Sequence, residues 1–74
     1  MDEIGACWVA TAPGYKATIK LVAVDYGSVF GQVYSQWVYS YTKGRVSRSG
    51  WKGSFKEARK ACDPPPGVVF RRVK

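Results

Sequence analysis

Apolar side chains occupy every second position in residues 15–24. The members of this set are Tyr15, Ala17, Ile19, Leu21 and Ala23. The positions between the first four carry Lys16, Thr18 and Lys20. A repeat of two residues places successive side chains on opposite faces of a β-strand. The segment therefore predicts a strand with one apolar face and one polar face.

The segments on either side of this strand predict reverse turns. Residues 4–12 alternate in the same way when extended, and Pro13-Gly14 supplies the residue types that a type II turn needs. A first hairpin is therefore expected. Residues 25–28, Asp-Tyr-Gly-Ser, predict the next turn.

β-Branched and aromatic residues then fill 29–34 and 37–42, with Ser35-Gln36 between the two runs. This pattern predicts either two strands or one strand broken by a bulge. Residues 45–51 are expected to return antiparallel to 37–41 as a hairpin centred on Gly44.

One short helix is predicted after this hairpin. Ser54 with Glu57 three residues later matches the capping box, in which the two residues satisfy backbone donors at a helix start. An apolar stripe follows, made of Phe55, Ala58, Ala61 and Cys62. Pro64-Pro65-Pro66 ends the helix because proline lacks the amide that a helix needs. Residues 67–74 predict a last strand.

These elements predict a single domain over residues 1–74, since a chain of 74 residues has room for one core only. The fold class is α+β: an antiparallel sheet of four to five strands with one short helix packed on a face. The order is a hairpin followed by β-β-α-β.

Positive charge is concentrated in residues 43–74, which carry ten Lys and Arg against Glu57 and Asp63. Their net charge is about +8, whereas residues 1–42 sum to about −1. Such a field serves solubility, and it also attracts polyanions or an acidic protein patch. The second half of the chain is thus expected to form the binding surface.

Residue types that commonly catalyse reactions or bind metal ions are scarce in this sequence. The chain has no histidine, and its five acidic residues show no paired spacing. Cys7 and Cys62 lie in apolar surroundings that favour free, packed thiols over a disulfide. We therefore expect no enzyme, no cofactor, no metal and no small-molecule substrate. The acidic start and the lack of a long apolar run predict a cytoplasmic protein without a membrane partner.

Basic and aromatic residues alternate on the predicted second hairpin. The candidate partner-binding residues are Lys43, Arg45, Arg48, Trp51, Lys52, Arg59 and Arg71. Lys56 and Lys60 extend this positive set along the helix. Arginines interleaved with aromatic rings occur both in single-strand nucleic-acid platforms and in protein interfaces. The alternative is that Trp37, Tyr39 and Tyr41 form an inward face and only the charges are exposed.

Two family resemblances cover the second half. Trp37, the Ser54–Ala58 run, the prolines and the terminal Gly-x-Val-x-Arg-x-Val of residues 67–73 resemble small β-β-α-β proteins with which tailed phages bind and redirect bacterial RNA polymerase. Residues 51–55, followed by Glu57-Ala58, resemble the strand-to-helix junction of the plant ethylene-response-factor DNA-binding domain.

The first resemblance implies a phage-encoded transcription regulator that docks on host bacterial RNA polymerase or an associated transcription factor. One alternative is a nucleic-acid-binding domain that uses the same surface on phosphates. Another is an inhibitor of a different host machine, such as a defence complex.

Overall fold

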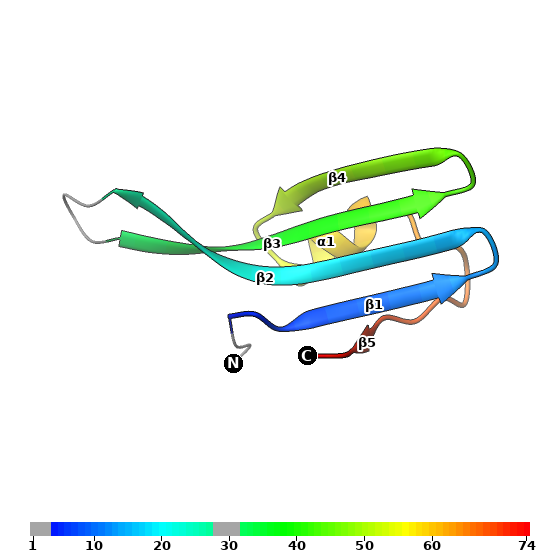
Figure 1. The fold of residues 1–74 in the computed structure, drawn as a ribbon, viewed down its shortest axis with the longest axis horizontal. Coiled ribbons are helices and arrows are strands. Elements are labelled where there is room, and N and C mark those ends of the chain that lie inside the picture. Colours follow the sequence, from blue (N-terminus) through cyan, green and yellow to red (C-terminus); the bar gives the residue numbers. More distant parts are fainter. Residues whose placement is uncertain (1–3, 28–31) are drawn as a thin grey trace.

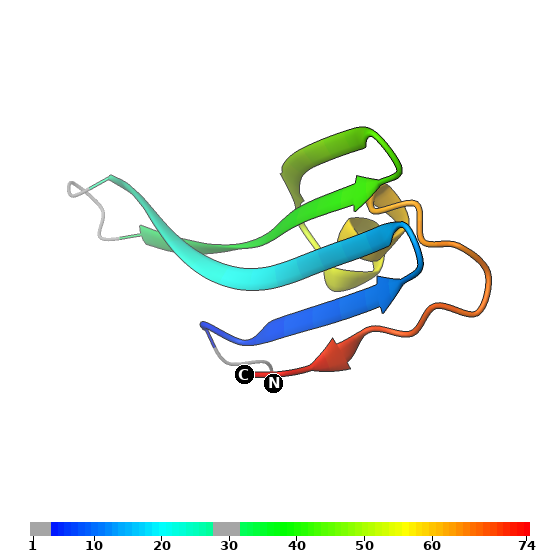
Figure 2. The same cartoon turned by 45° about the vertical axis from the view of Figure 1, so that its right-hand side comes forward.

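The computed structural model describes residues 4–27 and 32–74. Its elements, labelled in Figure 1, are β1 (Cys7–Ala12), β2 (Tyr15–Gly27), β3 (Gln32–Lys43), β4 (Val46–Lys52), α1 (Phe55–Ala61) and β5 (Arg71–Arg72). The strands form one sheet in the order β4-β3-β2-β1-β5, and every neighbouring pair is antiparallel. Helix α1 lies across one face of this sheet (Figures 1 and 2). The predicted α+β fold, with its hairpin start and single helix, is confirmed.

The two short turns lie together at one end of the sheet. Pro13-Gly14 joins β1 to β2, and Gly44-Arg45 joins β3 to β4. Gly14 and Gly44 have positive φ angles of 73° and 61°, which glycine adopts without a steric penalty. The amide of Gly44 donates to the carbonyl of Gly14 at 2.8 Å. This bond aligns the ends of the two hairpins.

The alternation in β2 decides which face is buried. Tyr15, Ala17, Ile19 and Leu21 are all at most 4% exposed, and they pack in one cluster with Ala58 and Cys62 of the helix region. Ala17 on the strand and Ala58 and Cys62 of the helix region are small, and they let the helix approach the sheet closely. The face that carries these side chains is called the helix side, and the opposite one the uncovered face.

An aromatic cluster, formed by Trp8, Trp37, Phe55 and Phe70, fills the rest of the helix side. Phe55 is central: its ring lies 5.1 Å from Trp8, 5.4 Å from Trp37 and 6.2 Å from Phe70. The tilted and edge-on geometries are those that aromatic quadrupoles favour. Phe55 thereby holds the start of α1 against strands from both hairpins.

Both ends of α1 are fixed by hydrogen bonds. At the start, the hydroxyl of Ser54 accepts from the amide of Glu57 at 3.2 Å, as predicted. The reciprocal bond of the capping box, from the Ser54 amide to the Glu57 carboxylate, is not formed in the described structure. At the other end, the Tyr15 hydroxyl donates to the carbonyl of Cys62 at 2.9 Å.

The long middle strands differ from the prediction. β3 runs unbroken through Ser35-Gln36, so it is one strand without a bulge at that point. β2 continues to Gly27, where a turn was expected, and the register shift lies between Asp25 and Gly27. The two strands extend beyond β1 and β4 as a two-stranded ribbon (Figure 1). Ser28 and the start of the 29–34 run lie outside the described residues.

The end of the chain also differs. Instead of a strand over residues 67–74, only Arg71–Arg72 has strand structure. Bonds from the Cys7 amide to the Lys74 carbonyl and from the Val73 amide to the Cys7 carbonyl continue the pairing with β1. The preceding segment contains the three prolines and a turn in which the Val68 amide donates to the Pro65 carbonyl. This segment passes the end of the sheet where the two hairpin turns lie (Figure 2).

We predict that Ser54→Ala lowers the free energy of unfolding by about 1 kcal/mol, because the Glu57 amide loses its acceptor. Chemical denaturation measures this difference. Ser49→Ala, on the exposed part of β4, is the matched control and should change stability by less than about 0.5 kcal/mol. Equal midpoints for Ser54→Ala and the wild type would contradict the capping role.

Candidate binding surface

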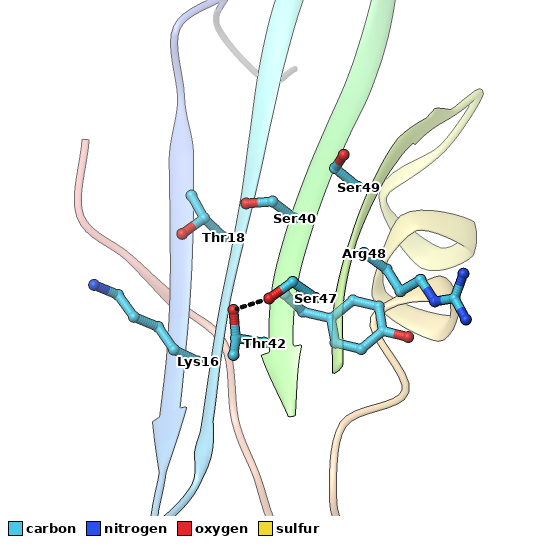
Figure 3. Close-up of a pocket in the computed structure, with 8 residues that line it drawn as sticks. Lys16, Thr18, Ser40, Thr42, Ser47, Arg48 and Ser49 are labelled. Atoms are coloured by element: carbon cyan, nitrogen blue, oxygen red, sulfur yellow. Dashed lines mark hydrogen bonds between the residues drawn. The ribbon is translucent and has the colours of Figure 1, made fainter. Parts of the chain in front are cut away.

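Strand β4 and helix α1 bring five exposed cations to one side of the molecule. They are Arg48, Lys52, Lys56, Arg59 and Lys60, and this set is called the β4–α1 basic surface. Arg48 and Lys52 belong to it because they pair with Tyr41 and Trp37, whose side chains face the helix. Figure 3 shows Arg48 directed away from the serine and threonine side chains of the uncovered face.

The strand cations and the helix cations meet at Lys52 and Lys60. Lys52 and Lys60 line a shallow hollow of about 250 Å³ together with Glu57 and Ala61. Two acidic residues lie beside these cations. Glu57 forms no ion pair in the described structure, and Asp63, which lines a hollow with Lys56, Arg59 and Lys60, pairs with Lys43. The arrangement leaves the five positive charges available to carboxylates or phosphates of a partner.

Lys43 is engaged elsewhere. Its ammonium lies 3.2 Å from the carboxylate of Asp63 and 3.4 Å from the carbonyl of the same residue. Both side chains are largely exposed, so the pair contributes about 0–1 kcal/mol. Among the described residues this is the one ion pair, and it ties the end of β3 to the chain after α1. Arg45 lies at the exposed turn beside it.

Trp51 and Arg71 lie on the other face of the sheet. Trp51 pairs with Val38 and is 57% exposed, and Arg71 pairs with Val9. They occupy opposite edges of the sheet, with β3, β2 and β1 between their strands. The structure therefore places Arg48, Lys52 and Arg59 on the helix side of the sheet, and separates Trp51 and Arg71 from them and from each other.

The aromatic residues of β3 follow the inward alternative. Trp37 is 9% exposed, and Tyr39 and Tyr41 pack against the core on the helix side. The Tyr39 ring covers Gly50, where a β-carbon would lie 2.9 Å from the tyrosine hydroxyl. Among Trp8, Tyr15, Trp37, Tyr39, Tyr41 and Trp51, the exposed ring is therefore that of Trp51.

The uncovered face carries a polar hollow that the sequence analysis did not single out. Its volume is about 440 Å³, and its lining includes Lys16, Thr18, Ser40, Thr42, Ser47 and Ser49 (Figure 3). The hydroxyls of Thr42 and Ser47 lie 3.2 Å apart. The signal was present in the sequence, because these residues are the polar positions of the same two-residue alternation.

The buried titratable groups are suited to packing. Cys7 and Cys62 are free thiols, as expected. Burial raises the pKa of Cys62 to about 11, so its thiol stays protonated at neutral pH. Burial, followed by the nearby Cys62, raises the pKa of Tyr15 to about 12. Within residues 4–27 and 32–74, no three His, Cys, Asp or Glu side chains are grouped to hold a metal ion.

In the described part of the chain, no helix has the length and apolar character needed to cross a membrane. Comparisons with protein-family models, with curated proteins and with solved structures found no match to this chain. The case for function rests on the surface itself.

We predict that stability falls as pH rises through 9–12. The folded state raises the pKa of Cys62 from 9.0 to about 11 and that of Tyr15 from 10.0 to about 12, so it holds these protons more tightly than the unfolded chain. Their contribution is complete below pH 9 and is lost as the pH rises through about 11 for Cys62 and through about 12 for Tyr15.

Chemical denaturation at successive pH values measures this loss. The Tyr15→Phe/Cys62→Ala variant should be less stable at neutral pH and should lose less stability in the alkaline range. The same alkaline dependence in both proteins would contradict the assignment to these two groups.

Proposed function

We propose that this chain is a non-enzymatic binding protein that docks through its β4–α1 basic surface on an acidic surface of bacterial RNA polymerase or an associated transcription factor. In this proposal it is encoded by a phage, acts in the cytoplasm of the infected host, and changes transcription by occupying its target. The supporting observation is the group of five exposed cations on two adjacent elements, none of them in an ion pair within the described structure.

The chemistry of these side chains suits a protein target. Arg48 and Arg59 each carry a planar guanidinium that binds a carboxylate through two parallel hydrogen bonds. Lysines beside them add positive charge that accelerates encounter with an acidic patch. The short connection from β4 to α1, Gly53-Ser54, holds the two groups of cations in a fixed relation. A preformed surface of this kind loses little conformational entropy when it binds.

The arrangement of aromatic rings favours protein over single-stranded nucleic acid. Proteins that bind single strands stack successive bases on exposed aromatic side chains. In this sheet Trp37, Tyr39 and Tyr41 pack beneath the helix instead, and Trp51 faces the opposite side from the basic surface. The β4–α1 basic surface thus offers charge without stacking rings.

Nucleic-acid binding remains the second candidate, and the uncovered face favours it. Lys16, with the hydroxyls of Thr18, Ser40 and Ser47, lines the hollow on that face. Lysine and hydroxyl groups are common donors to phosphate oxygens. The two candidates therefore use opposite faces of one sheet, and substitutions on each face distinguish them.

The test measures binding of purified RNA polymerase and of nucleic acid to the same set of variants. Arg48→Ala, Lys52→Ala and Arg59→Ala should weaken polymerase binding unequally, with one or two losses of about 2 kcal/mol or more. Lys16→Ala and Lys20→Ala, on the uncovered face, are matched charge controls and should leave it unchanged.

Nucleic-acid affinity should be weak at physiological salt. If phosphates are the target instead, log affinity falls with log salt by about 0.9 per DNA phosphate contact, and each lysine removed from the uncovered face reduces that slope by about one. Tight nucleic-acid binding without polymerase binding would reject the favoured function.

A further inference from the structure

Within residues 4–27 and 32–74, strand β4 is an open edge of the sheet, since it pairs with β3 on one side only. It is seven residues long and almost entirely exposed, and it contains no proline. The strand at the other edge, β5, is two residues long. An exposed edge of this length is a template on which another strand can add.

The hydrogen-bonding direction along β4 follows from the register. Gly44 continues the register opposite Gly14, and its amide donates to the Gly14 carbonyl. The backbone groups of Gly44 therefore point toward β2. Backbone groups alternate in direction along a strand, so every second residue of β3 bonds toward β2 and those between bond toward β4. The β3–β4 register then directs the N–H and C=O groups of Ser47, Ser49 and Trp51 out of the sheet. These groups have no backbone partner in the described residues.

The side chains along this edge divide by charge. Arg48 and Lys52 lie on the helix side, and Lys52 lines a hollow with Lys60 of α1. Ser47, Ser49 and Trp51 lie on the uncovered face. A strand added beside β4 would place alternate side chains against the cations and the others against Trp51 and the two serines. A basic edge repels basic strands and attracts acidic ones.

We propose that β4 is the docking edge for an extended acidic segment of a protein partner, which adds antiparallel to β4 as a further strand of the sheet. Acidic side chains of this segment face Arg48 and Lys52, and small polar or apolar side chains face Trp51. The inference rests on the proposed function in that it takes the partner to be an acidic protein, and it adds the mode of binding.

The test uses a capped peptide of about eight residues in which Glu alternates with Thr. In antiparallel addition, the Thr residues lie opposite Ser47, Ser49 and Trp51, so the Thr amides bond to β4 and the Glu amides point outward. Methylating the Thr amide nitrogens should weaken binding by about tenfold or more. Methylating the Glu amide nitrogens, with the same charge and mass, should leave the affinity unchanged.

Amide hydrogen exchange gives a second readout. The parent peptide should slow exchange at Ser47, Ser49 and Trp51, whereas Arg48 and Gly50, which already bond to β3, should change little. Arg48→Glu/Lys52→Glu should abolish peptide binding, and Lys16→Glu/Lys20→Glu on the uncovered face is the matched control that should retain it. Because the methylated peptides act on the unaltered protein, the proposal stays falsifiable if a variant fails to fold.

Equal affinities of the parent and both methylated peptides would overturn edge addition and leave electrostatic docking of an acidic partner standing. If affinity falls only when the Glu amides are methylated, the peptide binds as a parallel strand, and the antiparallel arrangement is overturned. Protection of the β4 amides in the protein alone at rising concentration would assign the edge to a second copy of the chain. Failure of the protein to bind polymerase at all would reject the proposed function, whatever the peptides do.

Discussion

The contact of Phe55 with Trp8, Trp37 and Phe70 holds the molecule together. A helix of seven residues is too short to be stable in water by itself, so α1 exists because its apolar stripe is buried. Phe55 is the first residue of that helix and follows β4 by only two residues. The same ring therefore anchors the helix and fixes where the cations of β4 and α1 lie. The β4–α1 basic surface therefore depends on this buried aromatic cluster for its shape.

One alternation in the sequence produces two faces with different chemistry. The apolar positions of β2 meet Ala58 and Cys62, and the polar positions carry Lys16 and Lys20 into solvent. Since side chains point to opposite faces at each step, neighbours in sequence such as Trp51 and Lys52 end on different surfaces. A stretch in which basic and aromatic residues are interleaved is thus divided by the sheet into a basic side and a mostly polar side.

Local signals predicted much of the fold. Residues close together in the sequence specify three features that the structure has: the alternation of β2, the Pro13-Gly14 turn and the Ser54 cap. Long-range pairing was less accessible. That β5 lies beside β1 and is only two residues long depends on partners more than sixty residues away, which composition does not reveal. The candidate site could be predicted only in part for the same reason. Only the register of the strands shows that Trp51 and Arg48 point to opposite faces.

The two thiols differ in how a reagent can reach them. Cys7 lies half-buried on the uncovered face, whereas Cys62 is fully buried beneath the helix with a pKa raised to about 11. A thiolate-directed reagent therefore meets Cys62 only when the helix leaves the sheet. The rate at which Cys62 is modified reports how often the core opens. Because Cys62 is a native residue, this measurement needs no introduced label. Binding that holds α1 in place slows this modification by a factor that grows exponentially with the free energy that binding adds.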